Sequence, residues 1–343
     1  MIKMGLVGLG GMGRGHLTTL EQLIEDGADI ELVALCDINP KAFQKSEKIL
    51  NLEGMEKDDY DFSKYHLYGN IDDMLANEKD LDIVNVVVPT YEHSTIACKV
   101  MNAGINCLSE KPMAVSLAQC QLMIDTAKKN NVRLMIGQCE RFSPAFSKLK
   151  EIIDNGTLGA PIGGYFHRGG SAPKTEWFFC REKGGGGLFD QHVHDVDMVQ
   201  WLYGMPKAVS TVGRVVRPGS GYDTSATNYL YDGKLCVHSS NIWVSNEPGF
   251  EEGFRADFEK GTVIWFEGGE FKVYDLNEQL IDIKPNFEGN SCTPYYEEIE
   301  YFIDLVKTGK ENTINPPEDS MESIRLALAE MKSADLGGQV VEL

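Results

Sequence analysis

The first 140 residues alternate short apolar runs with longer amphipathic stretches. The apolar runs are bounded by Gly, Asp or Pro and lie at 2–10, 30–37, 81–89, 105–112 and 132–137. Apolar runs without polar alternation predict strands that are buried on both faces. The stretches with helical periodicity lie between them, at 16–25, 39–50, 92–104 and 116–131. This alternation predicts an α/β fold of the Rossmann type, a doubly wound parallel sheet with crossover helices.

From about residue 145 the pattern changes. Helical periodicity recurs at 143–156, 190–204, 294–309 and 317–334. Between 206 and 285 short strand-like runs follow one another, separated by turn signals such as Asp232-Gly233. We therefore expect a Rossmann domain of residues 1–140 and an α+β domain of residues 141–343. The second domain should contain a large, mostly antiparallel open sheet, and its final helix can pack back on the first domain.

Composition and charge narrow the classes of partner. The chain has 343 residues, with 32 Lys and Arg against 52 Asp and Glu, which gives a net charge of −20. This balance disfavours nucleic acid and anionic membrane surfaces as partners. No apolar run approaches the ~20 residues of a membrane-spanning helix, and the first residues already read as a strand rather than a signal peptide. The eight cysteines are scattered without a C-x-x-C pair, so we expect free thiols and a cytoplasmic protein.

A glycine-rich loop follows the first predicted strand. Gly8, Gly10 and Gly13 form a G-x-G-x-x-G pattern between this strand and a predicted helix. In a dinucleotide site the first glycine permits the tight turn, the second admits the pyrophosphate, and the third lets helix and strand pack closely. The pattern alone is also compatible with a turn that binds nothing. Its position between strand and helix makes a dinucleotide site the favoured interpretation.

The second predicted strand ends at Asp37, 24 residues beyond Gly13. An acid there can accept hydrogen bonds from a ribose diol and would repel a 2′-phosphate, so NAD is favoured over NADP. A flavin dinucleotide is a further alternative that nothing else in the chain supports. The other residues expected to line the cofactor lie in this loop or after later strands of the sheet: Gly11, Met12, Pro89, Thr90, His93, Glu110 and Lys111.

The segment "GGGGLFDQHVHDVD" at 184–197 carries the densest chemistry. Asp190, His194 and Asp197 are spaced i, i+4 and i+7, which places them on one face if the segment is a single helix. A metal site lacks an evident third ligand, and a phosphate loop lacks the Lys-Ser/Thr of that motif, so we predict no metal. A buried core histidine is the ordinary alternative for His194. A proton-handling site is favoured because a nicotinamide fold accompanies it.

These motifs together resemble the glucose–fructose oxidoreductase/inositol dehydrogenase (Gfo/Idh/MocA) family over nearly the whole chain. The resemblance rests on "GLGGMG" at 8–13, "EKP" at 110–112, "RFSP" at 141–144 and "GGGGLFDQHVHDVDMVQWL" at 184–202. It implies an NAD(P)-dependent oxidoreductase in which Lys111, Asp190 and His194 correspond to the catalytic Lys and Asp-x-x-x-His pair. Asp197 looks more like a structural acid.

One segment departs from the family pattern. The position before "RF", where the family often has an Asn and a basic residue, reads Cys139-Glu140. A polar contact from residue 139 to cofactor or substrate is therefore in doubt.

The expected reaction is oxidation of a secondary alcohol on a polyol or sugar, or its reverse. His194 would act as general base, since its reference pKa is near ~6.5. Lys111 would stabilise the developing alkoxide, and Asp190 would orient the substrate or tune Lys111. Candidates for substrate contact are His167, Arg168, Trp177 and Tyr295, and Arg168, Lys174, Arg181 and Lys183 can form a local basic patch.

Three other functions stay open at this point. The chain can be a non-catalytic NAD-binding sugar sensor, a glycosidase that oxidises its substrate transiently with retained NAD, or a reductase of another carbonyl such as a sugar nucleotide or a dihydrodiol. An open sheet usually needs its exposed face covered, so a homodimer or homotetramer through the C-terminal sheet is expected.

Overall fold

The computed structural model describes residues 1–44, 57, 59–170, 172–173, 175–233, 235–244, 249–285 and 293–343. The chain divides into two compact units, one of residues 1–139 and 291–320 and the other of residues 140–290 and 321–343. The expected domain of 141–343 is thus interrupted, because the segment 291–320 belongs to the first unit. Its helix α8 (Pro294–Thr308) buries Ile299 and Phe302 in the same core as Leu17 and Leu20.

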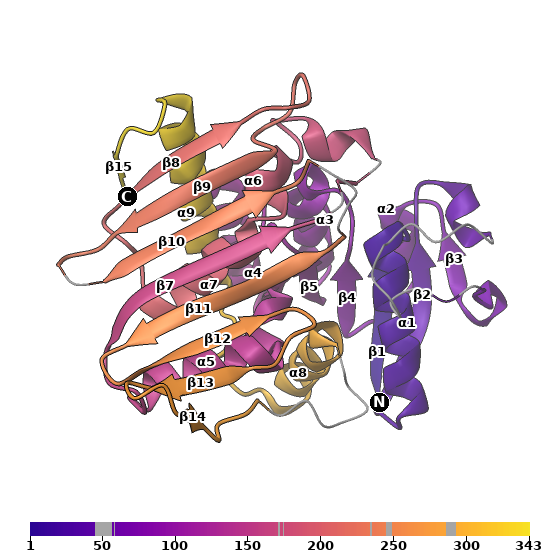
Figure 1. The fold of residues 1–343 in the computed structure, drawn as a ribbon. Coiled ribbons are helices and arrows are strands. Elements are labelled where there is room, and N and C mark those ends of the chain that lie inside the picture. The colour runs from indigo at the N-terminus through magenta and orange to yellow at the C-terminus, as the bar shows by residue number, and fades with distance from the viewer. Residues whose placement is uncertain are drawn as a thin grey trace. The chain divides into compact units, whose positions relative to one another are not determined.

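The first unit is built on a six-stranded parallel sheet with the order β3-β2-β1-β4-β5-β6 (Figure 1). Its strands are β1 (Ile2–Val7), β2 (Ile30–Cys36), β3 (His66–Tyr68), β4 (Ile83–Val86), β5 (Asn106–Glu110) and β6 (Leu134–Gly137). The order reverses between β1 and β4, and dinucleotides bind at such a switch point. The predicted parallel α/β sheet is confirmed, although β3 was not foreseen.

The helices of this unit are α1 (Gly11–Glu25), α2 (Ile71–Asn77), α3 (Thr90–Asn102), α4 (Leu117–Asn130), α8 and the start of α9 (Pro317–Asp335), with a 3-10 turn η2 (Phe62–Lys64). Ser116 caps α4, since its hydroxyl accepts from the Gln119 amide. The helix expected at 39–50 is only a 3-10 turn, η1 (Pro40–Phe43), as far as the chain is described, and residues 45–50 lie outside the described residues.

The second unit contains a nine-stranded sheet with the order β14-β13-β12-β11-β7-β10-β9-β8-β15. Its strands are β7 (Pro161–Gly169), β8 (Ala208–Arg214), β9 (Thr224–Leu230), β10 (Cys236–Ile242), β11 (Glu251–Phe258), β12 (Gly261–Phe266), β13 (Lys272–Asp275), β14 (Leu280–Ile281) and β15 (Val341–Glu342). Among the described strands of this sheet only β7 and β10 pair in parallel, so the predicted mostly antiparallel sheet is confirmed.

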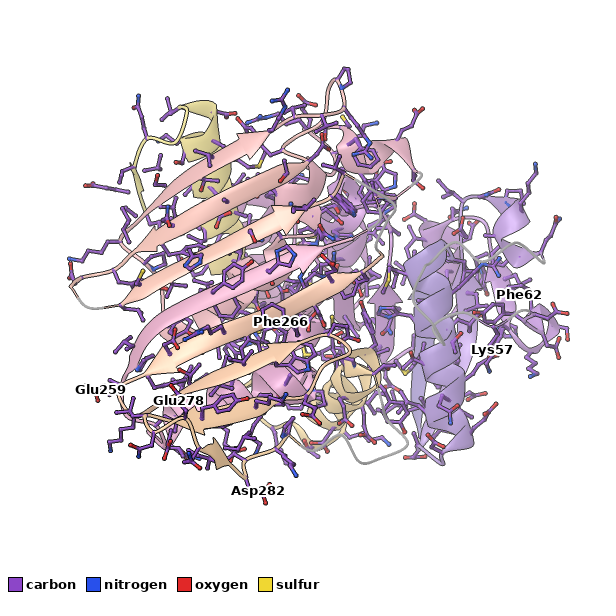
Figure 2. The ribbon with its side chains drawn as sticks, viewed as in Figure 1. Lys57, Phe62, Glu259, Phe266, Glu278 and Asp282 are labelled. Atoms are coloured by element: carbon purple, nitrogen blue, oxygen red, sulfur yellow. The ribbon has the colours of Figure 1, made fainter. Side chains whose placement is uncertain are left out.

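Helices cover one face of this sheet. They are α5 (Pro144–Asp154), α6 (Gly186–Asp190), α7 (Val193–Tyr203) and the larger part of α9, with 3-10 turns η3 (Cys139–Phe142) and η4 (Glu176–Phe179) beside them. Figures 1 and 2 show the other face open, with side chains such as Phe266 standing on it. Among the described residues, no helix is both long and apolar enough to cross a membrane.

Candidate active site

The glycine loop of the first unit fits a dinucleotide. Gly8 has a φ of +94°, and a Cβ there would lie 2.0 Å from the Val87 carbonyl oxygen. A Cβ on Gly13 would lie 2.0 Å from the Gly8 carbonyl oxygen, so this glycine lets α1 pack against β1. A Cβ on Gly10 would meet no described atom within 4 Å. Gly10 therefore borders open space at the N-terminus of α1, where backbone N–H groups favour a phosphate.

Asp37 lies at the carboxyl end of β2, directly beside this loop. Its Oδ2 accepts a hydrogen bond of 2.7 Å from the Leu9 amide, and its Oδ1 accepts one of 2.7 Å from the Asn39 amide. The carboxylate is thus fixed by backbone donors on both sides. The buried guanidinium of Arg14 donates to the Ala42 carbonyl at 2.8 Å, so this hydrogen bond goes to backbone and not to the Asp37 carboxylate. The electrostatics of this corner suit a ribose diol better than a phosphate.

Glu110, at the end of β5, organises the start of the E-K-P segment. Its Oε1 lies 2.8 Å from Nε2 of His16, and its Oε2 accepts from the Lys111 amide at 3.0 Å. Burial raises the pKa of Glu110, but the hydrogen bond from His16 and the nearby Lys111 charge outweigh it and hold the pKa below the usual range. Glu110 is therefore a buried carboxylate that fixes the backbone of Lys111. Sequence reasoning missed His16, which only the fold brings to β5.

His93, in the first turn of α3, holds two loops together. Its Nδ1 lies 2.7 Å from the Pro112 carbonyl oxygen and its Nε2 lies 2.8 Å from that of Val88. Both ring nitrogens are thus occupied by backbone carbonyls, so a cofactor hydrogen bond from His93 is not expected. Burial lowers its pKa. Pro89 and Thr90 lie at the start of the same helix, between β4 and His93.

In the second unit, the glycines of 184–187 serve close packing rather than phosphate binding. A Cβ on Gly184 would lie 2.6 Å from the Cα of Phe178, so η4 crosses directly over it. The amides of Gly184 and Gly185 both donate to the Cys180 carbonyl, and the Leu188 amide donates to that of Tyr222. These N–H groups are therefore already satisfied inside the protein.

The prediction of one helix carrying both Asp190 and His194 is wrong. Asp190 ends α6 and His194 is the second residue of α7, because the hydrogen-bond pattern of a single helix is interrupted at Gln191 and His192, although both residues keep right-handed helical dihedral angles. The His192 side chain is drawn into the interior, where its Nε2 lies 3.0 Å from the Ser239 hydroxyl. Asp190 and His194 are both more than nine-tenths buried. They lie on two successive helices that the residues Gln191 and His192 join.

Asp197 has a structural partner in the second unit. Its two carboxylate oxygens each accept a 2.8 Å hydrogen bond from Arg141, one from Nε and one from Nη2, and its Oδ1 also accepts from Ser323. Both side chains of the pair are essentially inaccessible. The Arg of the "RFSP" segment thus anchors α7 to the start of the unit.

Arg168 lies on the inner face of the sheet and is also surrounded by carboxylates. Its Nη1 is 3.1 Å from Glu140 and 2.5 Å from Glu252, and its Nε is 3.3 Å from Asp195. Only 1% of Arg168 is exposed, so the expected contact with substrate is not supported. His167 is the next residue of the same strand and points to the opposite, open face, where its Nδ1 lies 2.8 Å from Ser240. The two residues cannot line one pocket.

The other two predicted substrate contacts belong to different units. Trp177, in η4, is partly buried and stacks on Phe178 with ring centroids 3.8 Å apart. Tyr295 belongs to the first unit, where its ring lies 6.3 Å from that of His16. The basic patch is weakened, because Arg168 is buried and Arg181 pairs with Asp335. Lys174 lies outside the described residues.

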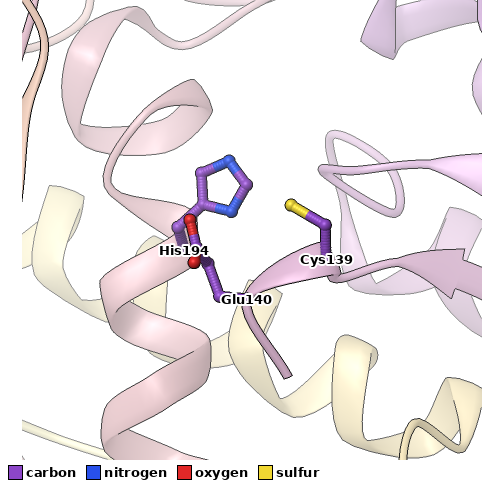
Figure 3. Close-up of side chains that lie close together, drawn as sticks. All are labelled: Cys139, Glu140 and His194. Carbon is purple, nitrogen blue, oxygen red and sulfur yellow. The ribbon is translucent and has the colours of Figure 1, made fainter. Parts of the chain in front are cut away.

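Glu140 and His194 lie close together inside the second unit, as Figure 3 shows with Cys139, the residue before Glu140. One potential ligand atom from each of the three lies within 4.8 Å of the others, and Asp190 is not in this group. The Glu140 carboxyl already bonds to Arg168, which competes with a metal. We therefore treat Glu140 as part of the charge network around Arg168.

Comparison with known proteins gives matches along most of the chain. The sequence model of the GFO/IDH/MocA oxidoreductase family, with an NAD-binding Rossmann fold, matches residues 2–138. The model of the GFO/IDH/MocA C-terminal domain matches residues 146–264. Inositol 2-dehydrogenase of Salmonella typhimurium is 29% identical, in an alignment that covers 100% of this chain and 97% of that protein. For scyllo-inositol 2-dehydrogenase (NAD(+)) of Bacillus subtilis the identity is 25%, with coverage of 90% and 87%.

A solved structure agrees with the fold. The WlbA dehydrogenase of Bordetella pertussis, in complex with NADH and UDP-GlcNAcA, superposes with a TM-score of 0.80. The sequences are 22% identical, and the match covers 100% of this chain and 97% of that one. At this identity the likeness concerns the arrangement of strands and helices.

Proposed function

Because the chain belongs to the GFO/IDH/MocA family of oxidoreductases, we propose that it transfers a hydride between NAD and a secondary alcohol or ketone of an inositol-like polyol or a sugar. The observation that carries this proposal is the cradle at Gly10, which is open where a pyrophosphate would lie. The similarity to inositol 2-dehydrogenases over the whole chain favours a polyol as the substrate class.

The preference for NAD over NADP rests on Asp37. Its carboxylate is held in place by the amides of Leu9 and Asn39, so it cannot easily turn away from an incoming ribose. A 2′-phosphate would meet this negative charge, whereas a 2′-hydroxyl can donate a hydrogen bond to it. The NAD(+) in the name of the Bacillus relative points the same way.

The proposed roles of the reacting side chains follow from their chemistry. Bound NAD would supply the hydride acceptor. His194 accepts the hydroxyl proton as general base, and Lys111 donates a hydrogen bond that stabilises the developing alkoxide. Lys111 follows Glu110 at the carboxyl end of β5, where ligands bind in doubly wound sheets. Asp190, at the end of α6, orients the substrate.

The test is a screen of inositols, aldoses and their derivatives for NAD reduction, followed by His194→Ala and Lys111→Ala. We expect turnover to fall by about 10²- to 10⁴-fold in both variants while NAD affinity stays near that of wild type. His167→Ala, on the open face of the sheet, is the matched control and should keep full turnover. Normal turnover in both active-site variants would refute the assignment.

Two alternative functions give different outcomes in the same screen. A sugar sensor would bind NAD without reducing it in the presence of any polyol or sugar. An enzyme that retains NAD and oxidises its substrate transiently would turn over without releasing free NADH. Release of stoichiometric NADH would exclude both.

We also propose that a second copy of the chain covers the open face of the nine-stranded sheet. Four exposed apolar side chains lie on that face, one each from β8, β9, β10 and β12: Val212, Leu230, Ile242 and Phe266. Figure 2 shows Phe266 on this face. Light scattering after gel filtration should give a dimer or tetramer, and Phe266→Glu should shift it toward the monomer.

A further inference from the structure

The charges around Arg168 do not balance if every carboxyl is ionised. One guanidinium faces Glu140, Glu252 and Asp195, and all four side chains are at least nine-tenths buried. Burying an ion without a compensating charge costs several kcal/mol, so such a cluster retains a proton. The position of that proton decides which charge lies beside His194.

Two of the carboxyls have a clear positive partner. Glu252 is the nearest to Arg168, at 2.5 Å from Nη1, and is its direct cross-strand neighbour. Asp195 faces the Nε of Arg168 and also lies 3.3 Å from His192. The charges of Glu330 and Asp195 overcome the effect of burial and raise the pKa of His192 to about 9, so His192 is a cation near neutral pH. Glu140 shares the Nη1 of Arg168 with Glu252 and lies farther from it than Glu252 does, at 3.1 Å.

We propose that Glu140 is a positioning residue for His194. In this role Glu140 is a neutral carboxylic acid, which accepts a hydrogen bond from Arg168 and donates one to Glu252. This inference rests on the proposed function of His194 as the base. Burial and the adjacent negative charge of Glu252 raise the pKa of Glu140 well above its usual range, which agrees with the neutral form.

The consequence for catalysis follows from distance. A carboxyl oxygen of Glu140 lies within 4.8 Å of a ring nitrogen of His194. An ionised carboxylate at that distance would strengthen the hold of His194 on a proton, and a general base for alcohol oxidation must start unprotonated. The neutral acid removes this charge while its hydrogen bonds to Arg168 keep Asp195, the neighbour of His194 on α7, in place. The groups near His194 that this argument uses are Glu140 and its neighbour Cys139, and, through Glu140, the side chains of Arg168 and Glu252.

The test compares Glu140→Gln with Glu140→Ala. Glutamine is neutral and can still accept from Arg168 and donate to Glu252, so kcat should stay close to wild type. Alanine removes both bonds and loosens the start of α7, so kcat should fall by about 10²-fold with the Kd for NAD unchanged. An equal fall of kcat in both variants would mean that an ionised Glu140 is required. A kcat near that of wild type in both variants would mean that Glu140 has no role. Either result overturns the proposal.

A second measurement needs no substrate. Titration of ¹⁵N-histidine signals by NMR, with the His194 signal identified by its loss in His194→Gln, reports the protonation midpoint of His194. In Glu252→Gln the acceptor charge is gone and Glu140 becomes the ionised partner of Arg168, so the His194 midpoint should rise by about one pH unit. Glu251→Gln, the adjacent residue on the open face, should leave the midpoint unchanged. A midpoint that does not move in Glu252→Gln overturns the proposal, whether or not the wild-type protein oxidises a polyol.

Discussion

The buried pair of Arg141 and Asp197 gives the sharpest prediction of stability. Asp197→Asn keeps the size of the side chain but replaces one accepting oxygen with an N–H group that faces the guanidinium. Arg141 then keeps its charge in a place where neither side chain is more than 1% exposed. Breaking one side of a buried pair costs about 3–5 kcal/mol, because an uncompensated charge remains. Two 2.8 Å hydrogen bonds are affected, which places the expected loss within this range.

Urea unfolding followed by tryptophan fluorescence can measure this loss in the second unit. Trp201 is a local reporter, since its ring lies 5.5 Å from the guanidinium carbon of Arg141. Asp154→Asn is the matched control, because Asp154 pairs with Lys150 on helix α5 with 54% and 25% of the two side chains exposed. For this control variant we expect the free energy of unfolding to fall by less than about 1 kcal/mol. A loss below about 1 kcal/mol in Asp197→Asn, or equal losses in both variants, would refute the reasoning from burial.

Three further predictions concern the cofactor loop and pH. Asp37→Ala should raise the Kd for NAD and lower the ratio of the Kd for NADP to the Kd for NAD, as measured by fluorescence titration with both cofactors. An unchanged ratio would contradict the proposal that Asp37 binds the ribose. Gly10→Ala should fold normally but bind NAD less tightly, because its added Cβ meets no described atom within 4 Å. Gly13→Ala should lower the Tm, because its added Cβ would lie 2.0 Å from the Gly8 carbonyl oxygen. The raised pKa of His192 should contribute up to ~3 kcal/mol of stability below its unfolded pKa of about 6.5, lost as pH rises through about 9. His192→Gln should flatten that part of the pH–stability curve, and an unflattened curve would count against a charged His192.

The parallel sheet could be predicted because its signal is local. Each predicted strand is a short apolar run closed by a turn residue, and the crossover helices between them have helical periodicity, with a capping serine at the start of α4. The segment after Asp37 shows the limit. Asn39 and Pro40 start a turn as their chemistry predicts, but the turn is 3-10. The guanidinium of Arg14 donates to the Ala42 carbonyl inside this turn and to the Gln44 carbonyl directly after it. A contact from α1 decides this geometry, and nothing in residues 39–50 records it.

The error at Asp190 and His194 has the same origin. Their spacing fits one helix, and the intervening residues have no proline or glycine to break it. The break is produced by His192, whose ring is bound by Ser239 on β10 and by Glu330 on α9. Both partners are far away in the sequence, so the periodicity of 184–197 could not reveal them.

The pairing of His167 and Arg168 as substrate contacts fails for a local reason. Both residues lie in β7, and consecutive residues of a strand point to opposite faces, so at most one of the two can face a pocket. Which one faces inward also follows from the pattern, because Phe166 and Arg168 share a face and Phe166 is fully buried. What the pattern cannot supply is the partner: the three carboxyls around Arg168 come from residues 140, 195 and 252. Periodicity therefore fixes the direction of a side chain, whereas its charge state and role depend on groups that only the fold brings together. For that reason the chemistry around Glu140 could be inferred from the structure but not from the sequence.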